Sequence, residues 1–212
     1  MTKQAKAVKT ETTEVAVKQP SKSKSFAVRF AETLEARNAE QYSKDTVTAL
    51  NNAIAGQKAI DLVMSKPEFK ELQASLLKSV RIADSKQNKH DFIAVKVLVK
   101  IVAALTAIGQ GLKSELDPYS RTIIANVIAL NQLNNKSALV SLSRSVVYDE
   151  LEQQAALVQH YNCSANTAGT QCSSTRQMLK ALDMCEVVKG KRNDIITIKD
   201  NARIQAMVAL FA

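Results

Sequence analysis

Residues 165–198 read ANTAGTQCSSTRQMLKALDMCEVVKGKRNDIITI, and this stretch decides the predicted fold of the C-terminal part of the chain. The alanine that opens it is small enough to let two helices cross closely. Gly169, four positions later, can adopt the left-handed conformation of a tight turn. Ser173 or Ser174 can cap the helix that follows such a turn. We therefore expect two short helices joined at Gly169, the second over residues 173–184.

The end of the same stretch predicts a β-hairpin. Val187 and Val188 begin one strand, because β-branched residues favour extended backbone. The isoleucines of residues 195–198 are typical of the returning strand, and Gly190 lies at the predicted turn. Three cations surround this turn: Lys189, Lys191 and Arg192.

A further helix is expected before this pattern, over residues 146–159, with Val147, Leu151, Ala155 and Val158 on one side. The order of two helices and a basic hairpin resembles the winged-helix branch of the helix-turn-helix superfamily of DNA-binding proteins, over about residues 146–200. Thr175 departs from the usual aliphatic residue of the second helix, and Glu186 stands where a helix-ending glycine is common. A helix pair and hairpin without a role at DNA is the alternative interpretation.

The resemblance implies that the helix over residues 173–184 lies in the major groove of double-stranded DNA. Arg176 and Gln177 would then read base edges, since arginine pairs with guanine and glutamine with adenine. Lysines and arginines of the helix end and hairpin would hold phosphates. The predicted DNA-binding residues are Ser173, Ser174, Arg176, Gln177, Lys180, Lys189, Lys191 and Arg192.

Residues 26–135 are predicted to form a helical bundle, because apolar residues recur there at helical spacing. The stripes are Phe26, Phe30 and Leu34; Val47, Leu50 and Ile54; Phe69, Leu72, Leu76 and Val80; and Ile123, Ile124, Val127, Ile128 and Leu130.

Capping signals in this bundle predict where its helices begin and end. Ser65–Glu68 matches a capping box with proline in the first turn, and Asp117–Pro118 starts the last helix. Residues 91–108 form a longer apolar segment, for which a helix is favoured over a buried strand by length. Gly109 and Gly111 are expected to end it.

Composition agrees with a mainly α fold. The chain has 212 residues, of which 46% are hydrophobic and five are glycine, fewer than glycine-rich barrels and sandwiches use for their turns. The net charge of +9 favours a polyanionic partner. Residues 1–25 contain six lysines and two glutamates without bulky apolar side chains, so they are predicted to be a flexible basic arm.

The sequence lacks the signatures of common enzymes and cofactor sites. The segment Gly109–Ser114 has neither the G-K-[ST] of a P-loop nor the third glycine of a dinucleotide loop. The cysteines and His160 are spaced without a C-x2-C pair, so we expect buried thiols and no metal. No catalytic residue, cofactor or metal ligand is therefore predicted.

The remaining features concern compartment and assembly. Three cysteines suit a reducing, intracellular compartment such as cytoplasm, nucleoid or nucleus. Lys96 and Lys100 interrupt the longest apolar stretch, which argues against a membrane span. Residues 201–212 predict an amphipathic helix that either closes the domain or pairs with a second subunit.

The sequence thus favours a flexible arm over residues 1–25, a helical bundle over residues 26–135 and a winged-helix-like domain over residues 136–212. Its predicted function is non-enzymatic DNA binding, in transcription control or another process at DNA. The alternative is a structural or assembly protein that oligomerises through the bundle and contacts nucleic acid without sequence preference.

Overall fold

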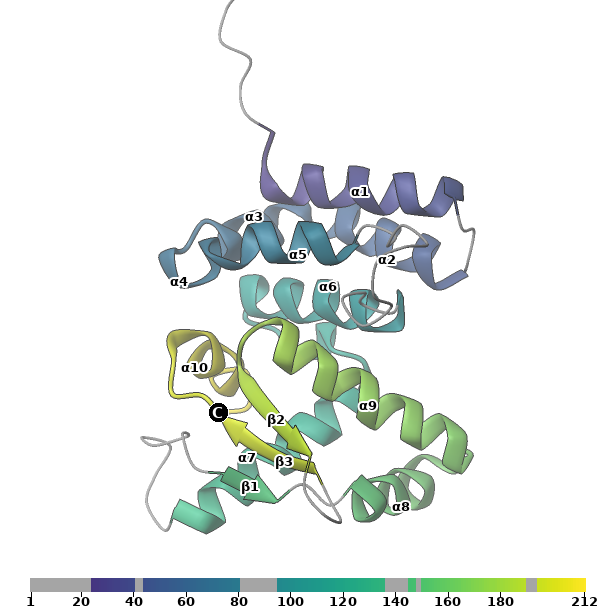
Figure 1. Cartoon of the computed structure of the whole chain (residues 1–212), viewed down its shortest axis with the longest axis vertical. Helices are drawn as coiled ribbons and strands as arrows, with labels where there is room; N and C mark the ends of the chain where they lie inside the picture. The colour runs from purple at the N-terminus through teal and green to yellow at the C-terminus, as the bar shows by residue number, and fades with distance from the viewer. Residues whose placement is uncertain (1–23, 41–43, 81–94, 136–144, 148–149, 190–193) are drawn as a thin grey trace, which may run out of the picture.

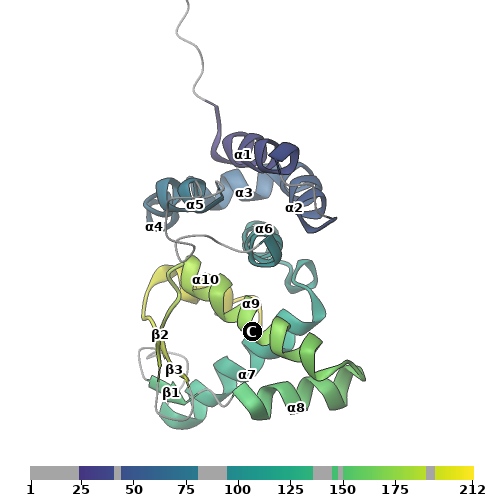
Figure 2. The same cartoon turned by 45° about the vertical axis from the view of Figure 1, so that its right-hand side comes forward.

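A computed structural model of the chain describes residues 24–40, 44–80, 95–135, 145–147, 150–189 and 194–212. These residues are mainly helical, with one small antiparallel hairpin near the C-terminal end. The helices form two layers that lie on opposite sides of helix α6 (Val95–Gln110), which Figure 2 shows almost end-on. Because both layers pack on it, α6 is apolar around most of its circumference.

The N-terminal layer lies above α6 in Figure 1. Its helices are α1 (Phe26–Glu40), α2 (Lys44–Ala55), α3 (Gln57–Met64), α4 (Pro67–Lys70) and α5 (Leu72–Val80). The stripes expected over residues 26–34 and 69–80 contribute to its core: Phe30, Leu34 and Phe69 are each at most 1% exposed. The stripe expected on α2 was wrong, because the buried residues of that helix are Thr46, Ala49 and Ala53, while Ile54 is 58% exposed. The predicted helical character of this part is confirmed, and residues 95–110 are a helix rather than a strand.

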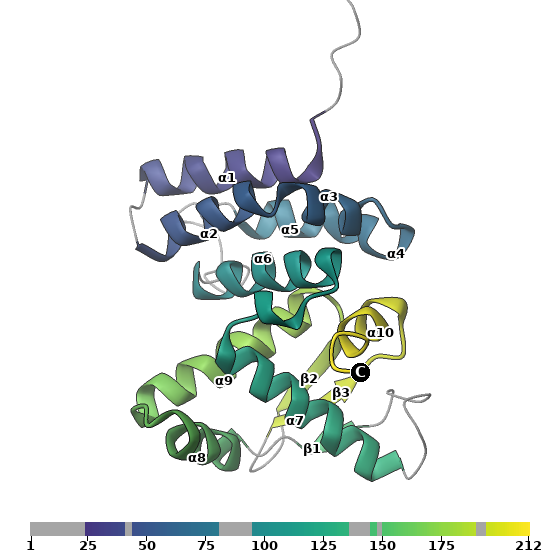
Figure 3. The same ribbon diagram turned by 180° about the vertical axis from the view of Figure 1, so that it is seen from behind.

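The C-terminal layer lies below α6, to which it is joined through the short 3-10 turn η2 (Lys113–Glu115). Its elements are α7 (Pro118–Asn135), β1 (Ser145–Val147), α8 (Glu150–Tyr161), α9 (Ala165–Ala181), β2 (Cys185–Lys189), β3 (Asp194–Ile198) and α10 (Ala202–Val208). Figure 3 shows α7 on the near side from behind, whereas α9 and the hairpin face the viewer in Figure 1. The two helices therefore lie on opposite faces of this layer.

The strands form one antiparallel sheet in the order β1-β3-β2. Val187 pairs in register with Ile196, so the predicted hairpin is confirmed, with its turn at residues 190–193 outside the described residues. Val146 pairs with the same Ile196 from the other side. Ile196 is 1% exposed, which ties the centre of the sheet to the core.

The helix expected over residues 146–159 was wrong at its start. Val146 and Val147 belong to β1, and the helix begins only at Glu150. The spacing of apolar residues along the sequence cannot show that these two β-branched residues pair with the edge of β3. Over residues 154–161 of α8, Leu157 is buried, at 0% exposure, while Ala155 is exposed.

The turn predicted at Gly169 was also wrong. Gly169 lies inside one continuous helix, α9, and the turn between the two helices is at residues 162–164. Asn162 takes the left-handed conformation there, with φ at 48°. Ser164, rather than Ser173 or Ser174, caps the helix, since its Oγ accepts a hydrogen bond from the backbone N–H of Thr167 at 3.1 Å.

Two other expected helix ends differ from the structure. Ser65 does not cap α4; the N-cap is Lys66, and the Ser65 hydroxyl donates to the carbonyl of Leu62 instead. Gly111 ends α6 with φ at 70°, but Gly109 remains within the helix, where it allows close packing. The cap at Asp117 is confirmed: its Oδ1 accepts the backbone N–H of Ser120 at 3.0 Å.

The described elements can be compared with the predicted arm, helical bundle and C-terminal domain. Residues 1–23, most of the predicted arm, lie outside the described residues. α7 packs against α9 and β1, across the boundary expected after residue 135. The C-terminal amphipathic helix is confirmed as α10, with Ile204 and Met207 buried. No helix within the described ranges combines the length and hydropathy that a membrane span requires.

Glycine contacts give a test of the packing between α3 and α6. A β-carbon at Gly109 would lie 2.4 Å from the carbonyl oxygen of Ala59, so Gly109→Ala must push the helices apart. We expect it to lower the free energy of unfolding by about 1–3 kcal/mol, as overpacking does. The measurement is urea-induced unfolding.

Gly169→Ala is the matched control. Its β-carbon would meet only the side chain of Gln154, at an ordinary 3.5 Å. Since alanine is the better residue inside a helix, this change should raise stability by about 0.5–1 kcal/mol. A loss instead would contradict an uninterrupted α9.

Candidate nucleic-acid interface

Helix α9 is the centre of the candidate interface, and its orientation follows from its buried face. Ala168, Cys172 and Thr175 are each 0% exposed, and Leu179 is 2% exposed. These positions recur every three or four residues, so they form one stripe that faces the core. The opposite face of α9 is left toward solvent, on the side seen in Figure 1.

A chain of polar contacts fixes this buried face. The Nζ of Lys100 on α6 donates to Asp117 Oδ2 at 2.8 Å and to the Ser120 hydroxyl at 2.7 Å. The Ser120 hydroxyl in turn lies 3.1 Å from the Thr175 hydroxyl on α9. Ser120 gives the buried Thr175 hydroxyl the partner that a buried polar group needs.

Burial and neighbouring charge shift the pKa values of Lys100 and Asp117. The Lys100 side chain is only 7% exposed, and this burial lowers its pKa below the ordinary value while Asp117 opposes the change. Burial alone would raise the pKa of Asp117. The Lys100 ammonium and the hydrogen bonds from Lys100 and Ser120 together lower that pKa below its ordinary 3.8. The Lys100 Nζ and Asp117 Oδ2 lie 2.8 Å apart, which is the geometry of an ion pair.

A second polar cluster fixes the C-terminal end of α9. Asp183 follows the helix with φ at 54°, and its Oδ1 accepts a hydrogen bond from Lys199 at 2.6 Å. Its Oδ2 accepts from Arg203, whose other terminal nitrogen donates to the carbonyl of Glu68 on α4. The Lys199 Nζ also lies 3.1 Å from Glu186 Oε1, so Glu186 contributes an ion pair to the same cluster. The cluster joins α9, the hairpin, α10 and the N-terminal layer.

The predicted DNA-binding residues of α9 do not all lie on its open face. Gln177 and Lys180 are exposed, and Ser173 and Arg176 are half-buried. Ser174 was wrongly predicted as a contact: it is 5% exposed, and its hydroxyl donates to the carbonyl of Thr170 at 2.7 Å. The error follows from the misplaced turn, which put Ser174 at an exposed helix start, whereas it lies in the middle of α9.

The cations expected at the hairpin turn fall mostly outside the described residues. Lys189 is the last residue of β2 and pairs in register with Asp194. Lys191 and Arg192 belong to residues 190–193, which are not described.

Sequence reasoning did not include the first turns of α9 in the candidate interface, because it assigned them to a separate helix before a turn at Gly169. Asn166 is exposed, and Thr170 lies one turn later on the same side. The buried stripe contains alanine, cysteine and threonine besides one leucine, so its low hydrophobicity concealed that one helix continues through Gly169. Ser164, a strong N-cap residue directly before the stripe, is the signal that marks the start of this helix.

The cysteines offer no reactive or metal-binding site among the described residues. Burial raises the pKa of the Cys185 thiol to about 12, so it stays protonated. Cys172 is buried, and half-buried Cys163 donates to the carbonyl of Leu157. No cluster of potential metal ligands occurs in the described ranges.

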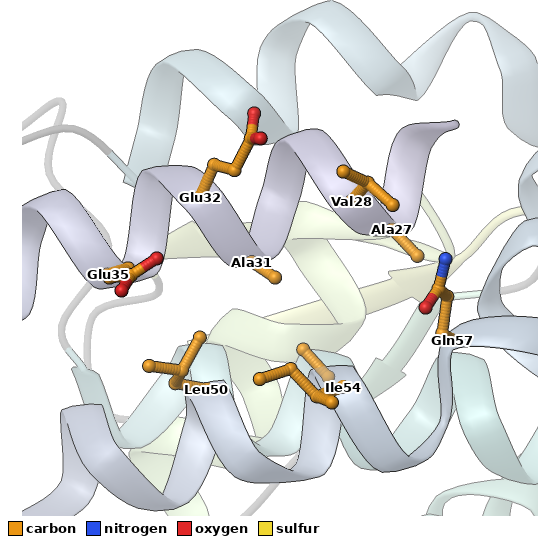
Figure 4. A pocket seen from close by; sticks show the side chains of 9 residues that line it. Ala27, Val28, Ala31, Glu32, Glu35, Leu50, Ile54 and Gln57 are labelled. Carbon is orange, nitrogen blue, oxygen red and sulfur yellow. The ribbon is translucent and has the colours of Figure 1, made fainter. Parts of the chain in front are cut away.

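The N-terminal layer carries two adjacent hollows. A groove of about 240 Å³ runs between α1 and α2, and Figure 4 shows Leu50 and Ile54 on one side and Ala31 on the other. Glu32 and Glu35 stand at its edge. A wider hollow of about 590 Å³ continues from Ile54 to Leu62. The groove between α1 and α2 has a mainly apolar lining, which suits packing against another surface, whereas the lining of the wider hollow is mixed.

The polar chain under α9 gives a prediction about stability. Lys100→Met leaves the Asp117 carboxylate without its counter-ion, and should cost about 2–3 kcal/mol at pH 7. A fully buried pair would cost more, but Asp117 is 34% exposed and partly screened. The native contribution of Asp117 is present above its unfolded pKa and lost as the pH falls through its lowered folded pKa. The difference from wild type should therefore shrink in acid.

Thr175→Val is the control for that variant. It keeps the shape of the side chain and removes one neutral hydrogen bond, worth about 0.5–1.5 kcal/mol. Its effect should not change between pH 7 and acid, when unfolding is followed by denaturant titration. A deficit of the Lys100 variant that does not depend on pH would contradict the ion pair.

A scan against models of protein families, together with comparisons with curated proteins and with solved structures, found no match for this chain. What the protein does must therefore be inferred from its own residues, fold and surface.

Proposed function

We propose that this protein is a non-enzymatic DNA-binding protein of the winged-helix type. In this proposal α9 enters the major groove of double-stranded DNA, and the hairpin β2–β3 contacts neighbouring phosphates. The process served is transcription control or another event at DNA in an intracellular compartment.

The observation that carries the proposal is the placement of α8, α9 and the hairpin. α8 and α9 are joined by a three-residue turn at residues 162–164, and α9 runs directly into β2 through residues 182–184. β1, immediately before α8, pairs with β3. The sheet thus ties the start of the helix pair to the hairpin, and the open face of α9 lies on the same side of the layer (Figure 1).

Charge supports a polyanionic partner. Lys180 is exposed near the end of α9, and Lys189, Lys191 and Arg192 cluster in sequence at the hairpin. Such a cluster repels itself unless an anion lies nearby. The DNA-binding unit that we propose includes α7, because α7 packs against α9 and β1.

Salt dependence of DNA affinity tests the proposal. Each phosphate contact contributes about 0.9 to the slope of log affinity against log salt. Changing Lys189, Lys191 and Arg192 together to alanine should therefore lower the slope by about two to three, with weaker binding to every sequence. Lys180→Ala should lower it by about one.

Lys58→Ala is the matched control, since Lys58 is an exposed lysine on α3 in the other layer. It removes the same charge without touching the proposed interface. A slope unchanged in the triple variant, or lowered equally by the control, would reject the hairpin as a DNA contact.

A second function is favoured by the apolar surface of the N-terminal layer. Ile54 is 58% exposed and Leu62 is 56% exposed, and both border the wider hollow. Large exposed aliphatic side chains that lie together are typical of interaction surfaces. We propose that this surface lets the protein assemble, as a structural protein that holds nucleic acid would.

Self-association tests this second function. The double change Ile54→Glu and Leu62→Glu should convert any oligomer to monomer in sedimentation velocity, while stability changes by less than about 0.5 kcal/mol because both positions are exposed. Ala74→Glu, at an exposed position on α5, is the control. If wild type and both variants sediment alike, the surface does not join copies of this chain.

A further inference from the structure

The open face of α9 carries a stripe of uncharged polar side chains. Asn166, Thr170, Ser173 and Gln177 follow one another at intervals of four, three and four residues, so they lie along one side of the helix. Residues 165–175 contain no charged side chain at all. Amide and hydroxyl groups can hydrogen-bond to phosphates, but they are also the groups that read base edges in the major groove.

Ser173 holds the carboxamide of Gln177 in one orientation. The Gln177 Nε2 donates to the Ser173 hydroxyl at 3.2 Å. A carboxamide nitrogen has two hydrogens, so the second hydrogen and the Oε1 acceptor remain available side by side. This adjacent donor and acceptor match the N7 acceptor and N6 donor of adenine in the major groove.

Asn166 offers the same pair of groups three helical turns earlier. Its side chain is exposed and makes no hydrogen bond within the described part of the chain. The neighbouring hydroxyls of Ser164 and Thr167 are hydrogen-bonded to each other within the helix cap, with their oxygens 2.9 Å apart. Asn166 is therefore the free recognition group at the start of α9.

Thr170 lies between the two carboxamides. Its hydroxyl donates to the carbonyl of Asn166 at 2.9 Å, within the helix itself. The γ-methyl is the part of the side chain outside that bond. A methyl group at this position suits contact with the C5-methyl of thymine.

We propose that this stripe makes α9 read A·T base pairs, with Asn166 and Gln177 each on an adenine, Thr170 on a thymine methyl and Ser173 as the positioning residue for Gln177. The inference rests on the proposed function and adds to it the class of DNA sequence. Each bidentate contact corresponds to a preference of roughly 5- to 150-fold over the wrong base pair.

Competition between labelled duplexes of equal length tests the inference with the full chain. The three duplexes contain only A·T pairs, only G·C pairs, or only inosine·cytosine pairs. Inosine·cytosine presents the major groove of G·C and a minor groove like that of A·T. We expect the A·T duplex to bind at least about tenfold tighter than both others. Replacing its adenines by 7-deazaadenine, which lacks the N7 acceptor, should remove the preference without any change in the protein.

Variants assign the preference to residues. Gln177→Ala and Asn166→Ala should each reduce it, whereas Asn51→Ala, an exposed amide on α2, should leave it unchanged. Ser173→Ala should reduce it and Ser173→Thr should keep it, because threonine retains the accepting hydroxyl. Thermal unfolding checks that each variant is folded.

The outcomes separate the inference from the function on which it rests. Equal, salt-dependent binding to all three duplexes would overturn the A·T inference and leave DNA binding standing. Inosine·cytosine bound as tightly as A·T would overturn it in favour of minor-groove recognition. Binding to none of them would reject both the inference and the proposed function.

Discussion

The contact between Lys100, Asp117, Ser120 and Thr175 holds the rest of this structure together. It joins α6, the start of α7 and the middle of α9 at one buried point. Burial of an ammonium destabilises the fold unless its hydrogen-bond partners are correctly placed. These contacts therefore allow few alternative positions of the three helices. The face of α9 that remains open is thereby fixed by a contact on its opposite side.

The Asp183 cluster complements that contact from the end of α9. The Asp183 carboxylate accepts hydrogen bonds from Lys199 and Arg203, and Arg203 also donates to the backbone carbonyl of Glu68 in the N-terminal layer. The hairpin, α10 and α4 are therefore held in one place relative to the end of α9. A helix fixed at its middle and at its end loses little backbone freedom when its exposed side chains contact a partner.

The two layers of the molecule present surfaces of different chemistry. The C-terminal layer presents a polar, partly cationic helix beside a basic hairpin, whereas the N-terminal layer presents Ile54, Leu62 and an apolar groove. α6 lies between them and contributes to both cores. In the two functions that we propose, DNA would bind to the C-terminal layer and copies of the chain would associate through the N-terminal layer, so one molecule could serve both.

The sequence by itself determined the helical class, the bundle core around Phe30 and Phe69, and a hairpin over residues 187–198, because strong apolar periodicity and β-branched runs on either side of a glycine are local signals. It also identified Gln177 and Lys180 as exposed. Only the tertiary structure decided the position of the turn, the strand at Val146 and the burial of Ser174. Those features depend on pairing with β3 and on the polar contact beneath α9, which join residues far apart in the chain. Local propensity does not contain that information.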